Sequence, residues 1–412
     1  MKDHFEEVTV PKAKPQRQML RILPYTLAAV FYMSVVLWVT VHGTALDYGA
    51  YLIGAHGFIT GQDVYQWKAT DFQAAAQQLN IPYFAYPYRY SPITALMISP
   101  LLAFPYRAGL FIWGLINAAA ILATGEVLSR LSAHPAKRWS IRFAVWLFAP
   151  FLVSIYAGQV NPLATLLGAL AVLAFGKGRD REAGSWAALA FLIKPIVIGL
   201  IGYPIWKGRW KMAVTFVLIA GVLFALMTTL FGWGSVQSGV PLSIAGIRTG
   251  AYPPLQNLWG TAQRWFTAHE YGWSLANNPA LSDQAGLLLS LGLGIATIMF
   301  CRPPFHRNSW RDADLGMVII AVALIVPATW YHHYAILAIP LAILIASSET
   351  LADIALVFVA WLAIGLFGVA WHDLVGHTLL LDTGTLGALI LWLGLARISK
   401  RQRAASSSRL PA

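Results

Sequence analysis

Long apolar runs separated by short polar tracts are the main feature of this chain. Asp, Glu, Lys and Arg are absent from residues 22–41, 90–106, 108–125, 143–176, 212–247, 285–301, 315–348 and 354–371. A further run at 183–206 holds one charge, Lys194, and another at 374–397 holds Asp382 and ends at Arg397. A helix needs about 20 mostly apolar residues to cross the hydrocarbon of a bilayer. The pattern therefore predicts an all-α polytopic membrane protein.

Two of the long runs contain a readable break and are predicted to form two segments each. The runs 143–176 and 315–348 have 34 residues each, so each must contain two segments. The stretch "AGQVNP" (157–162) divides the first run, and "VPATWYHHY" (326–334) divides the second. The total is then about 10–12 transmembrane segments, some of them short.

Two stretches are too polar to lie in lipid and are predicted to be outer loops, 44–90 and 232–283. In the first of them, "DFQAAAQQL" predicts a short amphipathic surface helix with Asp71 near its start. The predicted organisation is a cytosolic N-terminal segment (1–21), a membrane-embedded domain that includes both outer loops (22–397), and a cytosolic C-terminal tail (398–412).

The composition agrees with a membrane protein. Hydrophobic residues make up 58% of the chain and charged residues only 11%, too few to cover a water-soluble surface. The net charge of +12 would suggest nucleic acid in a soluble protein, but the basic residues cluster between apolar runs, so no nucleic-acid partner is predicted. The first apolar run is longer than a signal-peptide core and predicts a retained signal anchor with a cytosolic N-terminus. A single cysteine, Cys301, excludes an intrachain disulfide framework.

Basic tracts predict the topology. The tracts at 207–211, 302–311 and 397–403 mark the cytosolic side, which places Asp47, the 232–283 loop and "WYHH" on the opposite side. The same rule requires the basic tracts at 137–142 and 177–181 to be cytosolic, whereas twelve simple alternating spans place both outside. Either the rule fails there or some segments are re-entrant, around Pro100 or at Lys194-Pro195. The side on which "AGQVNP" lies is left open.

Asp47 stands just after the first predicted span, in "VTVHGTALDYGAY" (39–51). A positioned carboxylate at the edge of the bilayer can act as the general base that removes a proton from an attacking hydroxyl group. The alternative is a solvated or capping aspartate at a helix end.

Lys194, in "LIKPI", lies in the middle of an apolar run. A lysine in that environment is costly and is usually functional or paired. Pro195 predicts a helix break, and the backbone groups that it frees normally line a cavity. A phosphate oxygen is a natural partner for the ammonium group. The alternative is a side chain that reaches to the membrane interface from a short segment.

The pair His332-His333 lies at a predicted span boundary. Adjacent helical residues point about 100° apart, so the pair is poorly placed to bind one metal ion. One of them can instead donate a hydrogen bond or proton to a leaving phosphate, or the pair is simply interfacial. "WHDLVGH" (371–377) lacks metal-ligand spacing, and "RDADL" (311–315) is interpreted as loop charge, so no metal cofactor is expected.

In their order along the chain, these motifs resemble glycosyltransferase family 87, the polyprenol-phosphate-sugar-dependent mannosyltransferases of the GT-C membrane fold. The matching stretches, spread over residues 45–341, are "LDYGAYLIGAHGFITGQDVY", "YPYRYSP", "AGQVNPLATLLGALAV", "AGSWAALAFLIKPIVIGL" followed by "WKGRWK", "YPPLQNLWG" and "PATWYHHYAILAIPL". The chain departs from the family at Arg89 and Tyr90, where a second proline is more usual.

The resemblance implies a GT-C-type fold and an inverting enzyme of the cell (inner) membrane. It would move a hexose, with mannose the expected sugar, from a polyprenyl-phosphate donor to a lipid or glycan acceptor at an extracytoplasmic site. It implies Asp47 as base, His332 as the catalytic histidine with His333 as the alternative, and Lys194, Arg89 and His333 at the donor phosphate. Sugar or acceptor contacts are expected at Asp63, Tyr65, Tyr86, Tyr252, Gln256 and Asn257.

A transporter or lipid flippase is the alternative class. Transporters usually show paired halves and several intramembrane ionisable residues along a path. This chain has no evident internal repeat and one clear intramembrane charge, Lys194. Its acidic and aromatic residues are concentrated in the two outer loops, which favours the transferase.

Overall fold

The computed structural model describes residues 15–245, 250–301 and 312–407. The predicted cytosolic tract at 302–311, most of the N-terminal segment and the end of the tail lie outside the described residues. The described part contains α- and 3-10 helices and no β-strand. The all-α prediction is therefore confirmed.

The helices follow one another along the chain with short connections. They are α1 (Pro15–His42), α2 (Leu46–Ile59), α3 (Ala69–Gln78), α4 (Pro92–Ile98), η1 (Ser99–Ala103), α5 (Tyr106–Ser129), α6 (Pro135–Trp146), α7 (Ala149–Ala157), α8 (Asn161–Gly176), α9 (Asp180–Ile193), η2 (Pro195–Ile198), α10 (Gly199–Trp206), α11 (Trp210–Ala245), α12 (Leu258–Phe266), α13 (Pro279–Phe300), α14 (Asp312–Ile325), η3 (Tyr331–Leu337), α15 (Ala338–Ser347), α16 (Leu351–Ala370), α17 (Thr378–Leu381) and α18 (Thr383–Ser407).

Within the described residues, six helical segments are long and apolar enough to cross a membrane. They are Ile22–His42, Tyr106–Ser129, Pro135–Ala157, Trp210–Gln237, Pro279–Phe300 and Leu351–Ala370. The outer helices carry large exposed apolar side chains; on α11, Val217 is 65% exposed and Val222 is 66% exposed. A surface of this kind fits a lipid environment, because contact of so much apolar area with water would be unfavourable. The protein is thus a multi-pass membrane protein.

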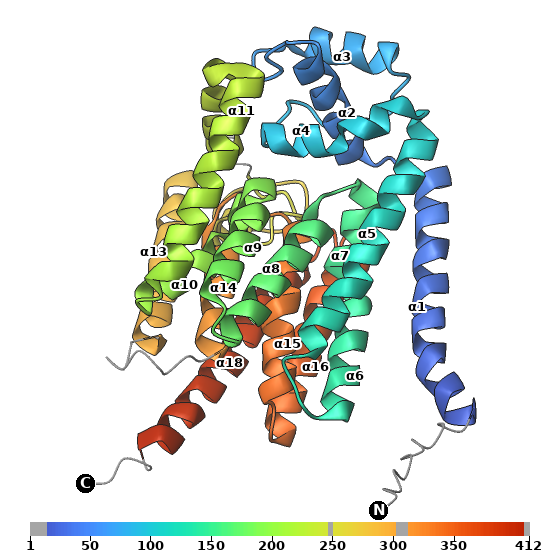
Figure 1. Ribbon diagram of the computed structural model, residues 1–412. Coiled ribbons are helices and arrows are strands. Elements are labelled where there is room, and N and C mark those ends of the chain that lie inside the picture. The colour runs from blue at the N-terminus through green and yellow to red at the C-terminus, as the bar shows by residue number, and fades with distance from the viewer. Residues whose placement is uncertain (1–14, 246–249, 302–311, 408–412) are drawn as a thin grey trace, which may run out of the picture.

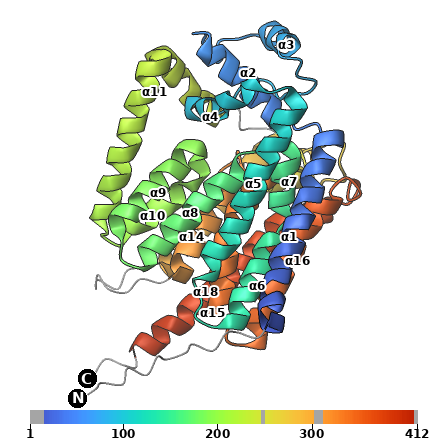
Figure 2. The same cartoon turned by 45° about the vertical axis from the view of Figure 1, so that its right-hand side comes forward.

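The long helices stand side by side, and a separate layer closes one end of the bundle (Figure 1). This layer, here called the cap, consists of residues 43–105 with α2, α3, α4 and η1. Both α1 and α18 reach the opposite end, here called the terminal side (Figure 1). Figure 2 shows the same separation after rotation, with α2 and α3 above the bundle.

The predicted span at 90–106 is wrong, because this segment belongs to the cap. It forms the short helix α4 and the 3-10 helix η1, which lie across the end of the bundle (Figure 1). Pro92 begins α4 and Pro100 begins the change to 3-10 geometry, so no continuous helix of membrane length can form.

The second irregular segment is the run 183–206, for which the sequence predicted a helix break at Pro195. The helix α9 ends at Lys194, whose extended backbone (φ −144°) reverses the chain into η2 and α10. The return leg ends near Lys207, whose Nζ lies 3.8 Å from Asp314 at the base of α14. The run is therefore a helical hairpin, with its bend toward the cap.

Because neither 90–106 nor 183–206 is a simple crossing, the basic tracts at 137–142 and 177–181 can lie on the same side as the other basic tracts. The tract at 137–142 lies on the terminal side, where Lys137 Nζ donates to the carbonyl of Ala346 near the end of α15 (3.0 Å). The tract at 177–181 lies in the turn between α8 and α9, at the same end (Figure 1). The sequence offered re-entrant segments around Pro100 or at Lys194-Pro195 as one explanation of the conflict. The chain departs from a simple crossing at both positions.

Candidate active site

Asp47 lies in the first turn of α2, in the cap and outside the membrane-spanning helices. Its carboxylate accepts a hydrogen bond from the Tyr90 hydroxyl. Burial raises the pKa of the Asp47 carboxyl above its ordinary value of 3.8, and the Tyr90 hydrogen bond and the charge of Lys194 oppose that rise. The side chain is therefore an enclosed carboxylate with a fixed orientation, which is unlike a solvated helix cap.

Tyr90 ends the cap loop just before α4 and is held from several directions. Its carbonyl accepts a hydrogen bond from the Tyr65 hydroxyl (2.5 Å), and the edge of its ring packs against Tyr51 with a centroid distance of 4.5 Å. Gln159 Nε2 donates to the Tyr90 hydroxyl (3.3 Å), and Gln159 Oε1 accepts from the Tyr51 hydroxyl (2.9 Å). These contacts hold the backbone, the ring and the hydroxyl group of Tyr90.

Gln159 lies in the turn between α7 and α8, within "AGQVNP". Gly158 before it adopts a left-handed conformation (φ 72°), which ends α7. The contacts of Gln159 with two cap tyrosines place this turn on the same side of the bundle as Asp47. The side of "AGQVNP", left open by the sequence, is thereby decided.

Lys194 occupies the bend of the α9–η2 hairpin and is 8% exposed. Its Nζ lies 3.0 Å from Nε2 of His333 and 5.3 Å from the centroid of the Tyr90 ring. The helix break thus delivers a buried cation to the cap side of the bundle, beside a histidine and over an aromatic face.

The two histidines occupy different surroundings at the start of η3. His333 contacts Lys194, and its Nδ1 accepts from the backbone N–H of Trp330 (3.2 Å). The His332 ring stacks on Trp330 with a centroid distance of 6.0 Å, and the His332 carbonyl accepts from Asn161 Nδ2 (2.9 Å). Their rings meet edge to face with a centroid distance of 4.5 Å, so both lie in one cluster.

The predicted Asp47, Lys194 and histidine pair therefore come together from three segments far apart in the sequence. Tyr90 and Gln159 complete the cluster, and neither was predicted as a site residue from the sequence. A signal for each was present, because both lie in stretches that stood out for their composition. Only the tertiary structure shows which side chain of each stretch lies near Asp47.

The remaining residues predicted in the cap are Asp63, Tyr65, Tyr86 and Arg89. Asp63 Oδ1 accepts from the backbone N–H of Tyr65 and closes a turn (3.1 Å). Tyr65 is buried, Tyr86 is 50% exposed and packs on Phe72, and Arg89 is exposed one residue before Tyr90. Tyr65 thus supports Tyr90 through its hydroxyl group, whereas Tyr86 and Arg89 lie on the surface.

Gln256 and Asn257 are fully buried, so the structure does not support the expected sugar contact for either. Gln256 Nε2 donates to the Pro253 and Leu381 carbonyls, and its Oε1 accepts from the backbone N–H of Thr385. Asn257 caps α12 by accepting from Gly260 N–H (2.8 Å), and its Nδ2 donates to the Pro327 and Thr329 carbonyls. Both amides hold the site-side loops together.

Tyr252 belongs to a partly exposed aromatic cluster next to the histidines. Its ring packs edge-on against Trp330 (5.4 Å between centroids), Tyr271 (5.9 Å) and Trp371 (6.1 Å). We call Tyr252, Tyr271, Trp330 and Trp371 the aromatic rim. Because the His332 ring stacks on Trp330, the rim is continuous with the Asp47–Lys194–His333 cluster.

The described residues include no group of three or more His, Cys, Asp or Glu side chains placed to hold a metal ion. The interpretation of Asp314 in "RDADL" as loop charge is wrong. This side chain is buried in α14, accepts from Ser399 Oγ (2.5 Å) and Tyr203 (3.3 Å), and joins helices at the terminal side.

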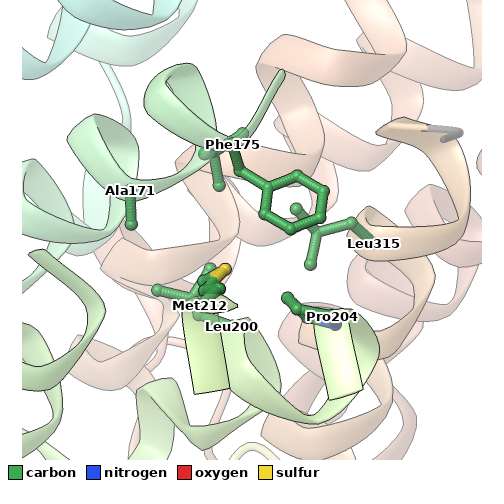
Figure 3. A pocket seen from close by; sticks show the side chains of 7 residues that line it. Ala171, Phe175, Leu200, Pro204, Met212 and Leu315 are labelled. Atoms are coloured by element: carbon green, nitrogen blue, oxygen red, sulfur yellow. The ribbon is translucent and has the colours of Figure 1, made fainter. Parts of the chain in front are cut away.

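A small apolar crevice lies between the end of α8, α10 and the start of α11, away from this cluster; Figure 3 shows the side chains that line it. It is lined by Ala171, Val172, Phe175, Leu200, Pro204, Met212 and Leu315. The lining side chains carry no ionisable or hydroxyl group, so the crevice has no means of catalysis.

Two comparisons with known proteins bear on this arrangement. The model of glycosyltransferase family 87 matches residues 88–327, more than half of the chain. The matched region includes Tyr90, Gln159 and Lys194. The chain is also 26% identical, over 383 residues, to the polyprenol-phosphate-mannose-dependent alpha-(1-2)-phosphatidylinositol pentamannoside mannosyltransferase of Mycolicibacterium smegmatis. The alignment covers 89% of this chain and 86% of that relative.

Proposed function

The chain belongs to glycosyltransferase family 87, and from this we propose that it transfers a mannosyl residue from a polyprenyl-phosphate donor to a glycolipid acceptor. The name of the mycobacterial relative supports both the donor and the acceptor class. The alternative of a transporter or flippase has no support from the family. The observation that carries the proposal is the meeting of Asp47, Lys194 and His333 at the cap side of the bundle.

Asp47 is the proposed general base. Inverting transfer requires a hydroxyl of the acceptor to attack the sugar carbon as its proton is removed. Asp47 is an enclosed, oriented carboxylate, and its raised pKa makes it a better proton acceptor than an ordinary aspartate. Its place in the cap lets a water-exposed acceptor meet a donor whose tail lies in the bilayer.

Lys194 and His333 are the proposed partners of the donor phosphate. As the bond between sugar and phosphate breaks, negative charge grows on the phosphate, and groups that stabilise this charge accelerate the reaction. A buried ammonium at a helix break, 3.0 Å from an imidazole, offers both a charge and hydrogen-bond donors. The family resemblance implied His332 as the catalytic histidine and His333 at the donor phosphate; the contact of His333 with Lys194 supports the phosphate role of His333.

The aromatic rim is the proposed contact surface for the acceptor glycan. Flat aromatic faces with polar edges suit sugar rings, and the rim borders the histidines. Of the residues expected to touch sugar or acceptor, Tyr252 is the one that the geometry favours.

The proposed location is the cell (inner) membrane, with cytosolic termini and an extracytoplasmic site. Basic tracts at 137–142, 177–181, 207–211 and 397–403 lie toward the terminal side, away from Asp47. Cytosolic flanks of membrane proteins carry such an excess of Lys and Arg. The support is therefore the agreement of all four tracts.

The test is transfer of labelled mannose from polyprenyl-phosphate-mannose to phosphatidylinositol mannosides by the purified protein in liposomes without an ion gradient. The expected result is a labelled glycolipid product that survives addition of EDTA, because we propose a metal-independent reaction. Movement of donor across the bilayer without a new glycosidic bond would support the flippase instead. Loss of product with EDTA and recovery with a divalent ion would overturn metal independence.

A further inference from the structure

We infer that Tyr90 is a positioning residue that keeps the proposed base and the proposed phosphate-binding cation apart. Its hydroxyl binds the carboxylate of Asp47, while its ring face lies under Lys194 Nζ at 5.3 Å from the centroid. The inference deepens the proposed function, because it depends on the roles assigned to Asp47 and Lys194.

Opposite charges in an enclosed site attract each other strongly, because little water screens them. Asp47 and Lys194 are close enough for each to influence the other electrostatically, yet the described residues record no ion pair between them. A direct ion pair would occupy the carboxylate that must take the acceptor proton. It would also neutralise the ammonium that must stabilise the phosphate, so the separation serves both roles.

Tyr90 is suited to this separation because its backbone, its ring and its hydroxyl group are each held by a neighbour. Tyr65 binds its carbonyl, Tyr51 packs against its ring, and Gln159 donates to its hydroxyl oxygen. Because the Tyr90 oxygen accepts a hydrogen bond from Gln159, the hydroxyl group is free to donate its own hydrogen bond to Asp47. The carboxylate is thereby held on the hydroxyl edge, and the ammonium stays over the face.

The hydrogen bond also adjusts the base. A donor to a carboxylate favours its charged form, so it limits the rise in pKa that burial causes in Asp47. The titratable or charged groups that face Asp47 are Tyr90, Tyr51 and Lys194, with His333 behind Lys194. Loss of the Tyr90 hydroxyl should therefore raise the pH at which Asp47 becomes protonated.

Tyr90→Phe separates the two functions of the residue, because it keeps the ring and removes the hydroxyl. The expected result is a fall in kcat of about tenfold or more, donor and acceptor KM within about twofold, and an acid limb of the rate profile displaced to higher pH. Tyr32→Phe is the matched control: it removes a buried hydroxyl bonded to the Trp146 carbonyl (2.5 Å), far from the site. Its profile should keep the wild-type shape.

Tyr90→Leu removes hydroxyl and ring together, and a cryo-EM structure of this variant provides a readout that needs no activity. The expected structure has the Asp47 carboxylate and Lys194 Nζ in direct contact. Separate groups in this variant, or an unchanged kcat and acid limb in Tyr90→Phe, would overturn the inference. If the wild-type protein transfers no sugar, the proposed function fails, and the structure of Tyr90→Leu still decides the spacing role.

Discussion

Asp47 is the residue whose chemistry is most directly testable. Asp47→Asn keeps the size and the hydrogen bond with Tyr90 but cannot accept a proton, so we expect kcat to fall about a hundredfold or more. The measurement is label transfer by the purified variant. Asp71→Asn is the control, because Asp71 accepts from the Lys68 backbone N–H at the start of α3 and lies outside the site. Near-normal turnover in Asp47→Asn would remove it as base and make Asp63 the next candidate.

The pH dependence of the rate follows from the same carboxyl. The base works in its ionised form, and burial raises its pKa above 3.8. Lowering the pH should therefore abolish kcat at a pH above that of an ordinary aspartate, and the rate should return as the pH rises through the Asp47 pKa. The check is kcat against pH, with the residual activity of Asp47→Asn as reference. An acid limb that persists unchanged in Asp47→Asn would assign it to another group.

Lys194 is expected to act on the chemical step. Lys194→Met keeps most of the apolar stem and removes the charge, so kcat should fall about tenfold or more while the acceptor KM changes little. The two constants are measured by varying the acceptor at saturating donor. A folded Lys194→Met protein with a normal rate and only a weaker acceptor KM would return Lys194 to a structural role.

At the scale of helices, the site depends on where helices stop. The turn before α8, the bend before η2 and the start of η3 all lie at the cap side, and each contributes a polar side chain to the cluster around Asp47, Tyr90 and Lys194. Interrupted helices of this kind have backbone groups that must be satisfied inside the protein. The same breaks were recognised in the sequence, as "AGQVNP", Lys194-Pro195 and "VPATWYHHY".

The loop that carries Tyr252 is held by Arg264, which donates to the Tyr252 carbonyl (3.3 Å) and belongs to a buried ion pair. Arg264 in α12 donates to Asp382 beside α17 (2.5 Å), and both side chains are nearly inaccessible. Arg264→Met should lower the free energy of unfolding by about 3–5 kcal/mol, because an unpaired carboxylate remains buried. Thermal unfolding in detergent measures the loss. The double variant Arg264→Met/Asp382→Leu should recover part of it; no recovery would mean that the pair is not the source of the stability.

At the scale of the whole molecule, the cap and the terminal side should lie on opposite faces of the membrane. Gln73 on α3 and Ser140 on α6 are both exposed, and Cys301 is buried, so single-cysteine probes have a low background. With a membrane-impermeant maleimide, Gln73→Cys should label in intact cells and Ser140→Cys only after lysis. Labelling in the reverse order would invert the proposed orientation and place the site in the cytosol.

The sequence alone determined the class of the protein and the positions of its helix breaks. Run length, scarcity of charge and the family motifs depend on local composition, so they can be recognised without a structure. The candidates Asp47, Lys194 and His332-His333 were also recognisable, because a polar group at the edge or middle of an apolar run is costly wherever the run packs. That cost is local to each run, so it could not predict that these residues lie together in one cluster.

Tertiary structure decided which segments cross the membrane and which side chains face Asp47. The segment 90–106 has the composition of a span, and its place in the cap comes from packing on α2. Tyr90, Gln159, Gln256 and Asn257 are polar side chains in similar loops. Tyr90 and Gln159 lie in the site, whereas the side-chain amides of Gln256 and Asn257 donate hydrogen bonds to backbone carbonyls elsewhere. This difference arises from contacts between segments far apart in the chain, which no local pattern of residues encodes.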